Sequence, residues 1–166
     1  MKTLFLLRHA KSSWDHPNLT DAQRPLNKRG QRDAPMIASR MAEKWPSPEQ
    51  VICSTALRAQ ETAAVMKKYW WKKTPVQSES SLYDNSVAGS LKIIHDANPT
   101  AQSLALVFHN PTITFLANSL GSLDIDNIPT CGIVILRSET KKWEEISAGC
   151  CELIDFDFPK RDHPTT

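Results

Sequence analysis

The stretch Leu4–Ser12, with the sequence LFLLRHAKS, is the strongest indication of the fold and of a functional site. Its four consecutive apolar residues indicate a buried strand that runs straight into Arg8 and His9. In open α/β sheets, ligands bind beside the carboxyl ends of the strands. A guanidinium at such an end favours an anionic ligand, and an imidazole beside it can act as a nucleophile.

Two other apolar runs lead to basic side chains in the same way. The predicted strand Gln50–Ser54 is followed by a helix with Arg58 in its first turn, and the predicted strand Leu104–Phe108 ends on His109. The carboxyl ends of parallel strands lie side by side. We therefore expect four side chains to converge: Arg8, His9, Arg58 and His109. A tetrahedral phosphate dianion is the ligand that fits such a cluster best, because guanidinium forks match its oxygens.

Strands alternate with helices through most of the chain, which predicts an α/β protein with a mostly parallel central sheet. The helices are expected over residues 28–44, 55–70, 86–97 and 112–120. Asn27 is expected to cap the first helix, and Pro35 to kink it or end a first short piece. Ser54 or Thr55 is expected to cap the second helix, and Gly121 to end the fourth.

Towards the C-terminus, residues 131–136, 143–146 and 152–156 are predicted strands. A hairpin turn over residues 139–142 is expected to join the first two. The 166 residues suit one domain, residues 1–166, with a loose polar tail over about 159–166.

The composition excludes several classes of protein. A net charge of +2 argues against partners such as nucleic acid or a membrane surface, and no apolar run approaches the roughly 18 residues of a membrane span. Arg8 interrupts the first apolar run too early for a signal peptide. The cysteines are Cys53, Cys131, Cys150 and Cys151. They show no metal-ligand spacing, so we expect no metal site and four reduced thiols in a cytoplasmic protein.

Four motifs in order resemble the histidine phosphatase superfamily, which is related to cofactor-dependent phosphoglycerate mutase. Leu7–Ser12 is similar to its first motif, Ser54–Ala63 to its second and His109–Pro111 to its late histidine motif. Arg24–Gly30, RPLNKRG, resembles a stretch of the small SixA-like phosphohistidine phosphatases. The resemblance covers residues 3 to about 136. It implies a phosphoglycerate mutase-like fold, a three-layer αβα sandwich.

The resemblance also implies roles by position. His9 would attack phosphorus and carry the phosphoryl group as phosphohistidine. Arg8, Arg58 and His109 would bind the phosphate oxygens and stabilise charge, and Arg24 would add a further phosphate ligand from its loop. Nearby arginines lower the pKa of an imidazole, which suits a neutral nucleophile. Because the arginines can supply the charge stabilisation, no metal or other cofactor is required.

Two residues depart from the wider pattern of the superfamily. Ala10 stands where glycine is usual, and alanine there is familiar in the SixA-like branch. Asp15, six positions after His9, stands where the mutases often have asparagine. A carboxylate beside the phosphate would repel it, so we expect Asp15 to point away from the site.

Alkyl phosphate esters need a proton for the leaving alkoxide. The nearest candidates are Asp84 and Glu79, and Asp84 is the candidate general acid, with a turn-forming aspartate as the alternative. A short chain implies an open pocket, and phosphohistidine has a good leaving group. We therefore expect a metal-independent phosphatase acting on protein phosphohistidine.

Two alternatives remain open for the function. One is a phosphatase of small phosphorylated metabolites in the same superfamily. The other is a catalytically inactive module that binds phosphate or phosphoprotein. The presence of Arg8, His9, Arg58 and His109 together disfavours the inactive module.

Overall fold

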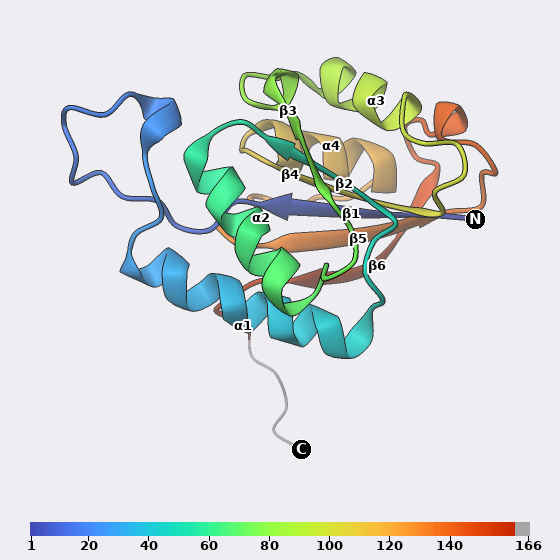
Figure 1. Ribbon diagram of the computed structural model, residues 1–166. Helices are drawn as coiled ribbons and strands as arrows, with labels where there is room; N and C mark the ends of the chain where they lie inside the picture. The colour runs from blue at the N-terminus through green and yellow to red at the C-terminus, as the bar shows by residue number, and fades with distance from the viewer. Residues whose placement is uncertain (162–166) are drawn as a thin grey trace.

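The computed structural model describes residues 1–161; the end of the expected loose tail, residues 162–166, lies outside the described residues. The strands are β1 (Lys2–Arg8), β2 (Gln50–Ser54), β3 (Val76–Glu79), β4 (Ser103–Phe108), β5 (Ile133–Ser138) and β6 (Cys151–Asp157). They form one sheet in the order β3-β2-β4-β1-β5-β6 (Figure 1). The first four strands in this order are parallel, and β5 and β6 are antiparallel to their neighbours. The predicted mostly parallel central sheet is confirmed.

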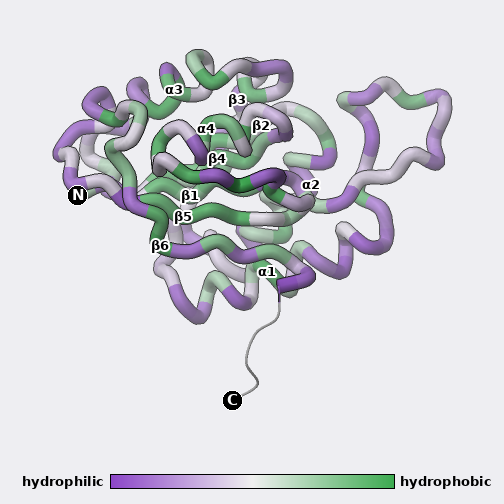
Figure 2. Tube along the Cα trace, turned by 180° about the vertical axis from the view of Figure 1, so that it is seen from behind, coloured by the Kyte–Doolittle hydropathy of each residue, from purple (hydrophilic) through white to green (hydrophobic). Residues whose placement is uncertain are grey.

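Helices cover both faces of this sheet. They are α1 (Lys28–Lys44), α2 (Leu57–Tyr69), α3 (Val87–His95) and α4 (Thr112–Gly121). Phe5 and Leu7 of β1 belong to the core layer with α1 and α2, and Leu4 and Leu6 belong to the layer with α3 and α4. The apolar central strands run between the two helical layers (Figure 2). The fold is therefore the expected three-layer αβα sandwich.

Pro35 does not end a first piece of α1, because the helix runs without interruption over 17 residues. A proline inside a helix costs roughly 3 kcal/mol. Ile37 and Met41 are fully buried against the sheet, and each buried apolar side chain contributes about 1.5–3 kcal/mol. Packing of the apolar face therefore outweighs the lost helical hydrogen bond.

Two predicted helix ends are also corrected. The N-cap of α2 is Ala56 rather than Ser54 or Thr55, and no side chain caps it. The hydroxyl of Ser54 lies 2.7 Å from a ring nitrogen of His109 instead. Gly121 is the last helical residue of α4, and Ser122 takes the left-handed conformation with φ of 50°.

The predicted strand over residues 143–146 and its hairpin are wrong. Trp143–Glu145 forms a short 3₁₀ helix, η3, and β5 pairs directly with β6. The Trp143 indole is buried and donates a hydrogen bond of 2.9 Å to the carbonyl of Ala101. Its apolar character therefore reflects tertiary packing rather than a strand. Within residues 1–161, no helix is long and apolar enough to cross a membrane.

Candidate active site

Three adjacent strands build the candidate site. Because β2, β4 and β1 are neighbours and parallel, their carboxyl ends open onto the same edge of the sheet. An open pocket of about 300 Å³ lies there. Its lining includes the five predicted phosphate-site residues: Arg8, His9, Arg24, Arg58 and His109. The structure thus brings together side chains from β1, from α2, from the end of β4 and from the loop before α1.

His9 is held with one ring nitrogen available to a ligand. Its Nδ1 lies 2.8 Å from the carbonyl oxygen of Ala10. A carbonyl only accepts, so Nδ1 carries the hydrogen and Nε2 carries the lone pair. Burial, followed by the charges of His109, Arg58 and Arg8, lowers the pKa of His9 to about 3, against the opposing hydrogen bond to Ala10. The imidazole is therefore neutral at physiological pH.

His109 lies beside His9, with the two ring centroids 5.1 Å apart. Its Nε2 is 2.7 Å from the hydroxyl oxygen of Ser54, and its buried Nδ1 has no hydrogen-bond partner within the described chain. Burial and then the charge of Arg58 lower the pKa of His109 to about 4, although Asp21 acts in the opposite direction. This side chain is also neutral near pH 7.

Two arginines of the pocket lining each have a donor without a partner among the described residues. Arg8 donates from Nη1 to the carbonyl of Ile128 at 2.9 Å. Arg58 donates from both terminal nitrogens to Asp21, at 2.8 Å to the carbonyl and 3.0 Å to the carboxylate. The buried Nε of each arginine has no partner among residues 1–161. Guanidinium groups in a pocket lining favour an anionic ligand.

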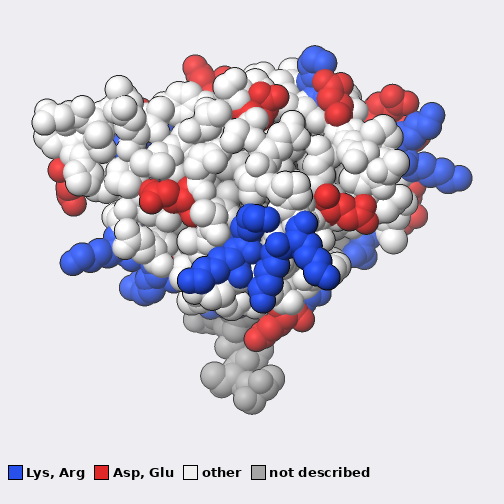
Figure 3. All heavy atoms as spheres, in the orientation of Figure 1, with Lys and Arg blue, Asp and Glu red and all other residues white. Residues whose placement is uncertain are grey.

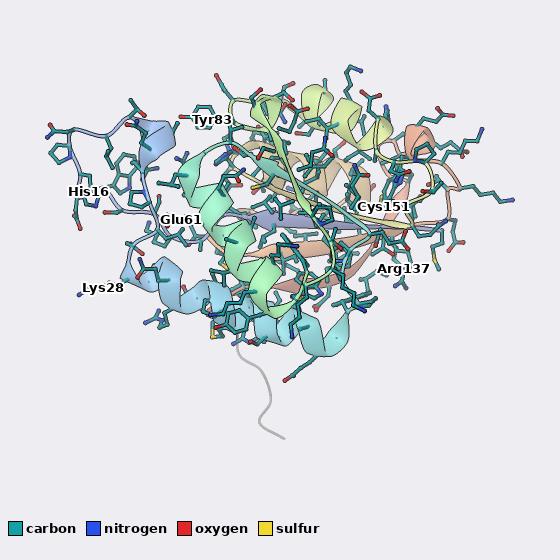
Figure 4. The ribbon with its side chains drawn as sticks, in the orientation of Figure 1. His16, Lys28, Glu61, Tyr83, Arg137 and Cys151 are labelled. Atoms are coloured by element: carbon teal, nitrogen blue, oxygen red, sulfur yellow. The ribbon has the colours of Figure 1, made fainter. Side chains whose placement is uncertain are left out.

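Arg24 reaches the pocket from the loop before α1, as expected. Its Nη1 donates to the Ser12 hydroxyl at 2.8 Å, and its Nε donates to the Asp21 carboxylate at 3.1 Å. The guanidinium carbon lies 3.6 Å from the centre of the Trp14 ring. Glu61 of α2, labelled in Figure 4, anchors this loop by accepting a 2.9 Å hydrogen bond from the backbone of Leu26.

The motifs did not point to Asp21 or Tyr83. The Asp21 carboxylate accepts from Arg24, from Arg58 and, at 2.5 Å, from the hydroxyl of Tyr83. Figure 4 shows Tyr83 directed towards the segment that contains Asp21. The Tyr83 hydroxyl, then Arg58 and Arg24, lower the pKa of Asp21 to about 2. The three-residue spacing from Asp21 to Arg24 was the one available signal of this contact.

The other acidic candidates lie outside this cluster. Asp84 is exposed, lines a neighbouring small hollow, and makes no hydrogen bond or ion pair with any described residue. Glu79 accepts from the backbone of Ser81 at 3.5 Å and so caps a short 3₁₀ helix. Asp15 is exposed and does not line the phosphate pocket. A general-acid role for Asp84 stays a prediction.

Two of the arginines that line the site are buried rather than exposed on the surface. Arg24 and Arg58 are buried, whereas Lys67, Lys68, Lys72 and Lys73 are exposed. The exposed lysines belong to the far end of α2 and the residues after it, where Figure 3 shows a group of basic side chains. The part of the chain that the structure describes contains no cluster of three or more potential metal ligands.

The sequence of this chain is similar to those of known proteins. Residues 4–88 match the model of the histidine phosphatase superfamily (branch 1). The Mycobacterium leprae protein ML1117 is 31% identical, over 93% of this chain and 100% of its own.

Two solved structures extend the comparison. A proposed phosphohistidine phosphatase SixA from Agrobacterium tumefaciens has a TM-score of 0.80 and 26% identity, over 95% of this chain and 98% of its own. The mycobacterial glucosyl-3-phosphoglycerate phosphatase Rv2419c has a TM-score of 0.72 and 15% identity, over 95% of this chain and 100% of its own. At 15% identity, the second likeness concerns the fold alone.

Proposed function

We propose that this chain, which belongs to the histidine phosphatase superfamily, is a phosphatase that passes a phosphoryl group through His9 to water. One observation carries the proposal. His9, with its unprotonated Nε2, lines one pocket with Arg8, Arg58 and His109, and each of these three side chains has a buried nitrogen without a partner in the described chain: Arg8 Nε, Arg58 Nε and His109 Nδ1. A nucleophile and three phosphate-binding donors are what phosphoryl transfer requires.

The first step forms a covalent intermediate. Phosphate oxygens accept from the two arginines and from His109, whose tautomer with hydrogen on Nδ1 is favoured when Ser54 donates to Nε2. The His9 lone pair then attacks phosphorus. The bond from phosphorus to the leaving group breaks, and the leaving group keeps the electron pair and takes up a proton from solvent. The guanidinium groups stabilise the charge on the equatorial oxygens.

The second step regenerates the enzyme. Water attacks the phosphorus of the phosphorylated His9 and loses a proton to solvent. The phosphorus–nitrogen bond breaks, inorganic phosphate leaves, and the lone pair returns to Nε2. The low pKa of His9, about 3, keeps the product imidazole neutral and ready for another cycle.

The substrate we propose is a phosphorylated histidine of a protein. An imidazole leaving group picks up a proton readily, so the reaction does not depend on a strong general acid such as the one that alkoxides need. The Asp21 carboxylate, with its pKa of about 2, is ionised in the free enzyme and unsuited to that role. The open pocket suits a group on a protein surface, and the likeness to the Agrobacterium SixA protein supports the same substrate.

The test is a substrate panel with wild type and His9→Ala. Wild type should release phosphate from a phosphohistidine protein faster than from sugar or glycerate phosphates, and should form an acid-labile phosphoenzyme. His9→Ala should retain binding and lose both turnover and phosphoenzyme. Faster turnover of a small ester would establish the metabolite phosphatase instead. Absence of turnover and phosphoenzyme in wild type would establish the binding module.

A further inference from the structure

Trp14 is an exposed aromatic side chain at the mouth of the phosphate pocket. It is 73% exposed, more than any other large apolar side chain in residues 1–161. It nevertheless lines the same pocket as His9, Arg58 and His109. Single exposed apolar residues are common on protein surfaces, so the exposure alone carries no argument. Its place in the lining of the pocket that contains His9 is the observation that matters.

The Trp14 ring is held in place from one side. The guanidinium of Arg24 stacks on it at 3.6 Å from the ring centre. That guanidinium is itself fixed by hydrogen bonds to Asp21, Ser12 and Ser13. One face of the indole therefore rests on an immobilised cation, and the high exposure means that the opposite face is open. A rigid aromatic surface binds a planar ring with little loss of conformational entropy.

The geometry of phosphoryl transfer places the leaving group near this surface. The attacking and leaving atoms lie roughly in line on opposite sides of phosphorus. His9 is buried at 7% exposure and attacks from inside, so the leaving group lies on the solvent side, at the pocket mouth. Among the described Trp, Tyr and Phe side chains, Trp14 is the one in the lining of this pocket.

We infer that the open face of Trp14 is a platform for the leaving group and selects substrates whose phosphorus is attached to a planar ring. The imidazole of phosphohistidine is such a ring, so the inference rests on the proposed function and extends it. The ring of the substrate stacks on Trp14 while Arg8, Arg58 and His109 hold the phosphate. Trp14 then contributes to binding and takes no part in the bond changes.

Binding of two phosphonates tests the platform without any turnover. Phenylphosphonate carries a ring on phosphorus and methylphosphonate does not, and calorimetry measures the Kd of each. Trp14→Leu should raise the Kd of phenylphosphonate about two- to tenfold and leave that of methylphosphonate unchanged. Trp14→Phe should retain most of the affinity for phenylphosphonate. Leu19→Ala removes another exposed apolar side chain from the same loop, outside the pocket lining, and should change neither Kd.

Two results would overturn the platform. An equal loss of affinity for both phosphonates in Trp14→Leu would show that Trp14 acts only by holding Arg24. No loss for either would show that the ring is an ordinary exposed residue.

With a phosphohistidine peptide, Trp14→Leu should raise KM by a similar factor at unchanged kcat. If wild type fails on the peptide while the phosphonate difference persists, the proposed substrate fails and the platform stands.

Discussion

The Asp21 carboxylate balances the charge of two arginines that face the same pocket. It accepts hydrogen bonds from Arg24, Arg58 and the Tyr83 hydroxyl, so it occupies donors that an anionic ligand could use. The same negative charge repels an incoming phosphate. Asp21 therefore both orders the arginines and opposes the ligand.

Replacing Asp21 by Asn tests which of these effects is larger. We expect inorganic phosphate to inhibit Asp21→Asn about three- to tenfold more strongly, because a negative charge near the anion is removed. Tyr83→Phe is the matched control, since it removes one hydrogen bond to Asp21 and leaves the charge. Its inhibition constant should stay close to that of wild type. Weaker inhibition of Asp21→Asn by phosphate would mean that ordering of the arginines dominates.

The buried histidines make stability depend on pH. The folded-state pKa values of His9 and His109, about 3 and about 4, lie below the ordinary value of 6.5, so the unfolded chain takes up protons first as the pH falls. The stabilisation is complete above pH 6.5 and is lost progressively towards pH 4 and below. Between pH 7.5 and 5 the free energy of unfolding should fall by roughly 2 kcal/mol per histidine. Urea unfolding at both pH values measures the change, and His9→Gln should show about half of it. If the free energy of unfolding of His9→Gln falls as much as that of wild type, the contribution assigned to His9 is contradicted.

The histidines and arginines of the pocket could be predicted because each follows an apolar run or stands in a recognisable motif. The contact between Asp21 and Tyr83 could not be predicted, because the two residues are 62 positions apart and no periodic pattern in the sequence indicates their contact. Asp84 was favoured as the general acid because it is an acidic residue in the loop after the second predicted helix. In the structure the Tyr83 side chain contacts Asp21 of the cluster, and the Asp84 side chain is exposed.

At the level of elements, the start of α1 supports the loop that carries the first motif. The backbone of Asn27 donates to the carbonyl of Lys11 at 3.0 Å, and the Asn27 side chain caps α1 through the backbone of Gly30 at 2.9 Å. Gly30 itself packs directly against Lys11. A Cβ at this position would clash with the backbone carbonyl oxygen of Lys11.

We therefore expect Gly30→Ala to damage both stability and activity. The backbone of Lys11 cannot move aside as a flexible side chain would, so overpacking should lower the free energy of unfolding by about 1–3 kcal/mol. The displaced loop also holds Ser12, a partner of Arg24, so kcat/KM should fall too. Ser39→Ala, at an exposed position of the same helix, is the control and should change neither quantity. Wild-type stability in Gly30→Ala would show that the loop accommodates the methyl group.

Helices and strands were predicted best where a local sequence signal, such as an apolar run or a capping residue, agrees with the observed structure. The apolar run before His109 predicts β4, and the capping residue Asn27 marks the start of α1. They were predicted least well where burial overrides local preference. Pro35 lies within an unbroken helix, and Trp143 packs as part of a short 3₁₀ helix.

On the scale of the whole molecule, the proposed phosphoryl transfer uses arginine and histidine side chains and no metal ion. Activity should therefore be unchanged after dialysis against EDTA, and added Mg²⁺ or Zn²⁺ should not raise it. Phosphate release from the preferred substrate measures both effects. A loss on chelation that is restored by one metal ion would contradict the proposed mechanism.

The central place of β1 bears on how the protein is made. Within residues 1–161, β1 pairs with Ser103–Phe108 and Ile133–Ser138, which are synthesised much later than β1 itself. Its apolar run, Leu4–Leu7, has no sheet partner until Ser103–Phe108 has emerged. Long-range pairing of this kind slows folding and leaves apolar segments open to aggregation. A nascent chain therefore contains its proposed nucleophile well before the strands that complete the surrounding pocket have been synthesised.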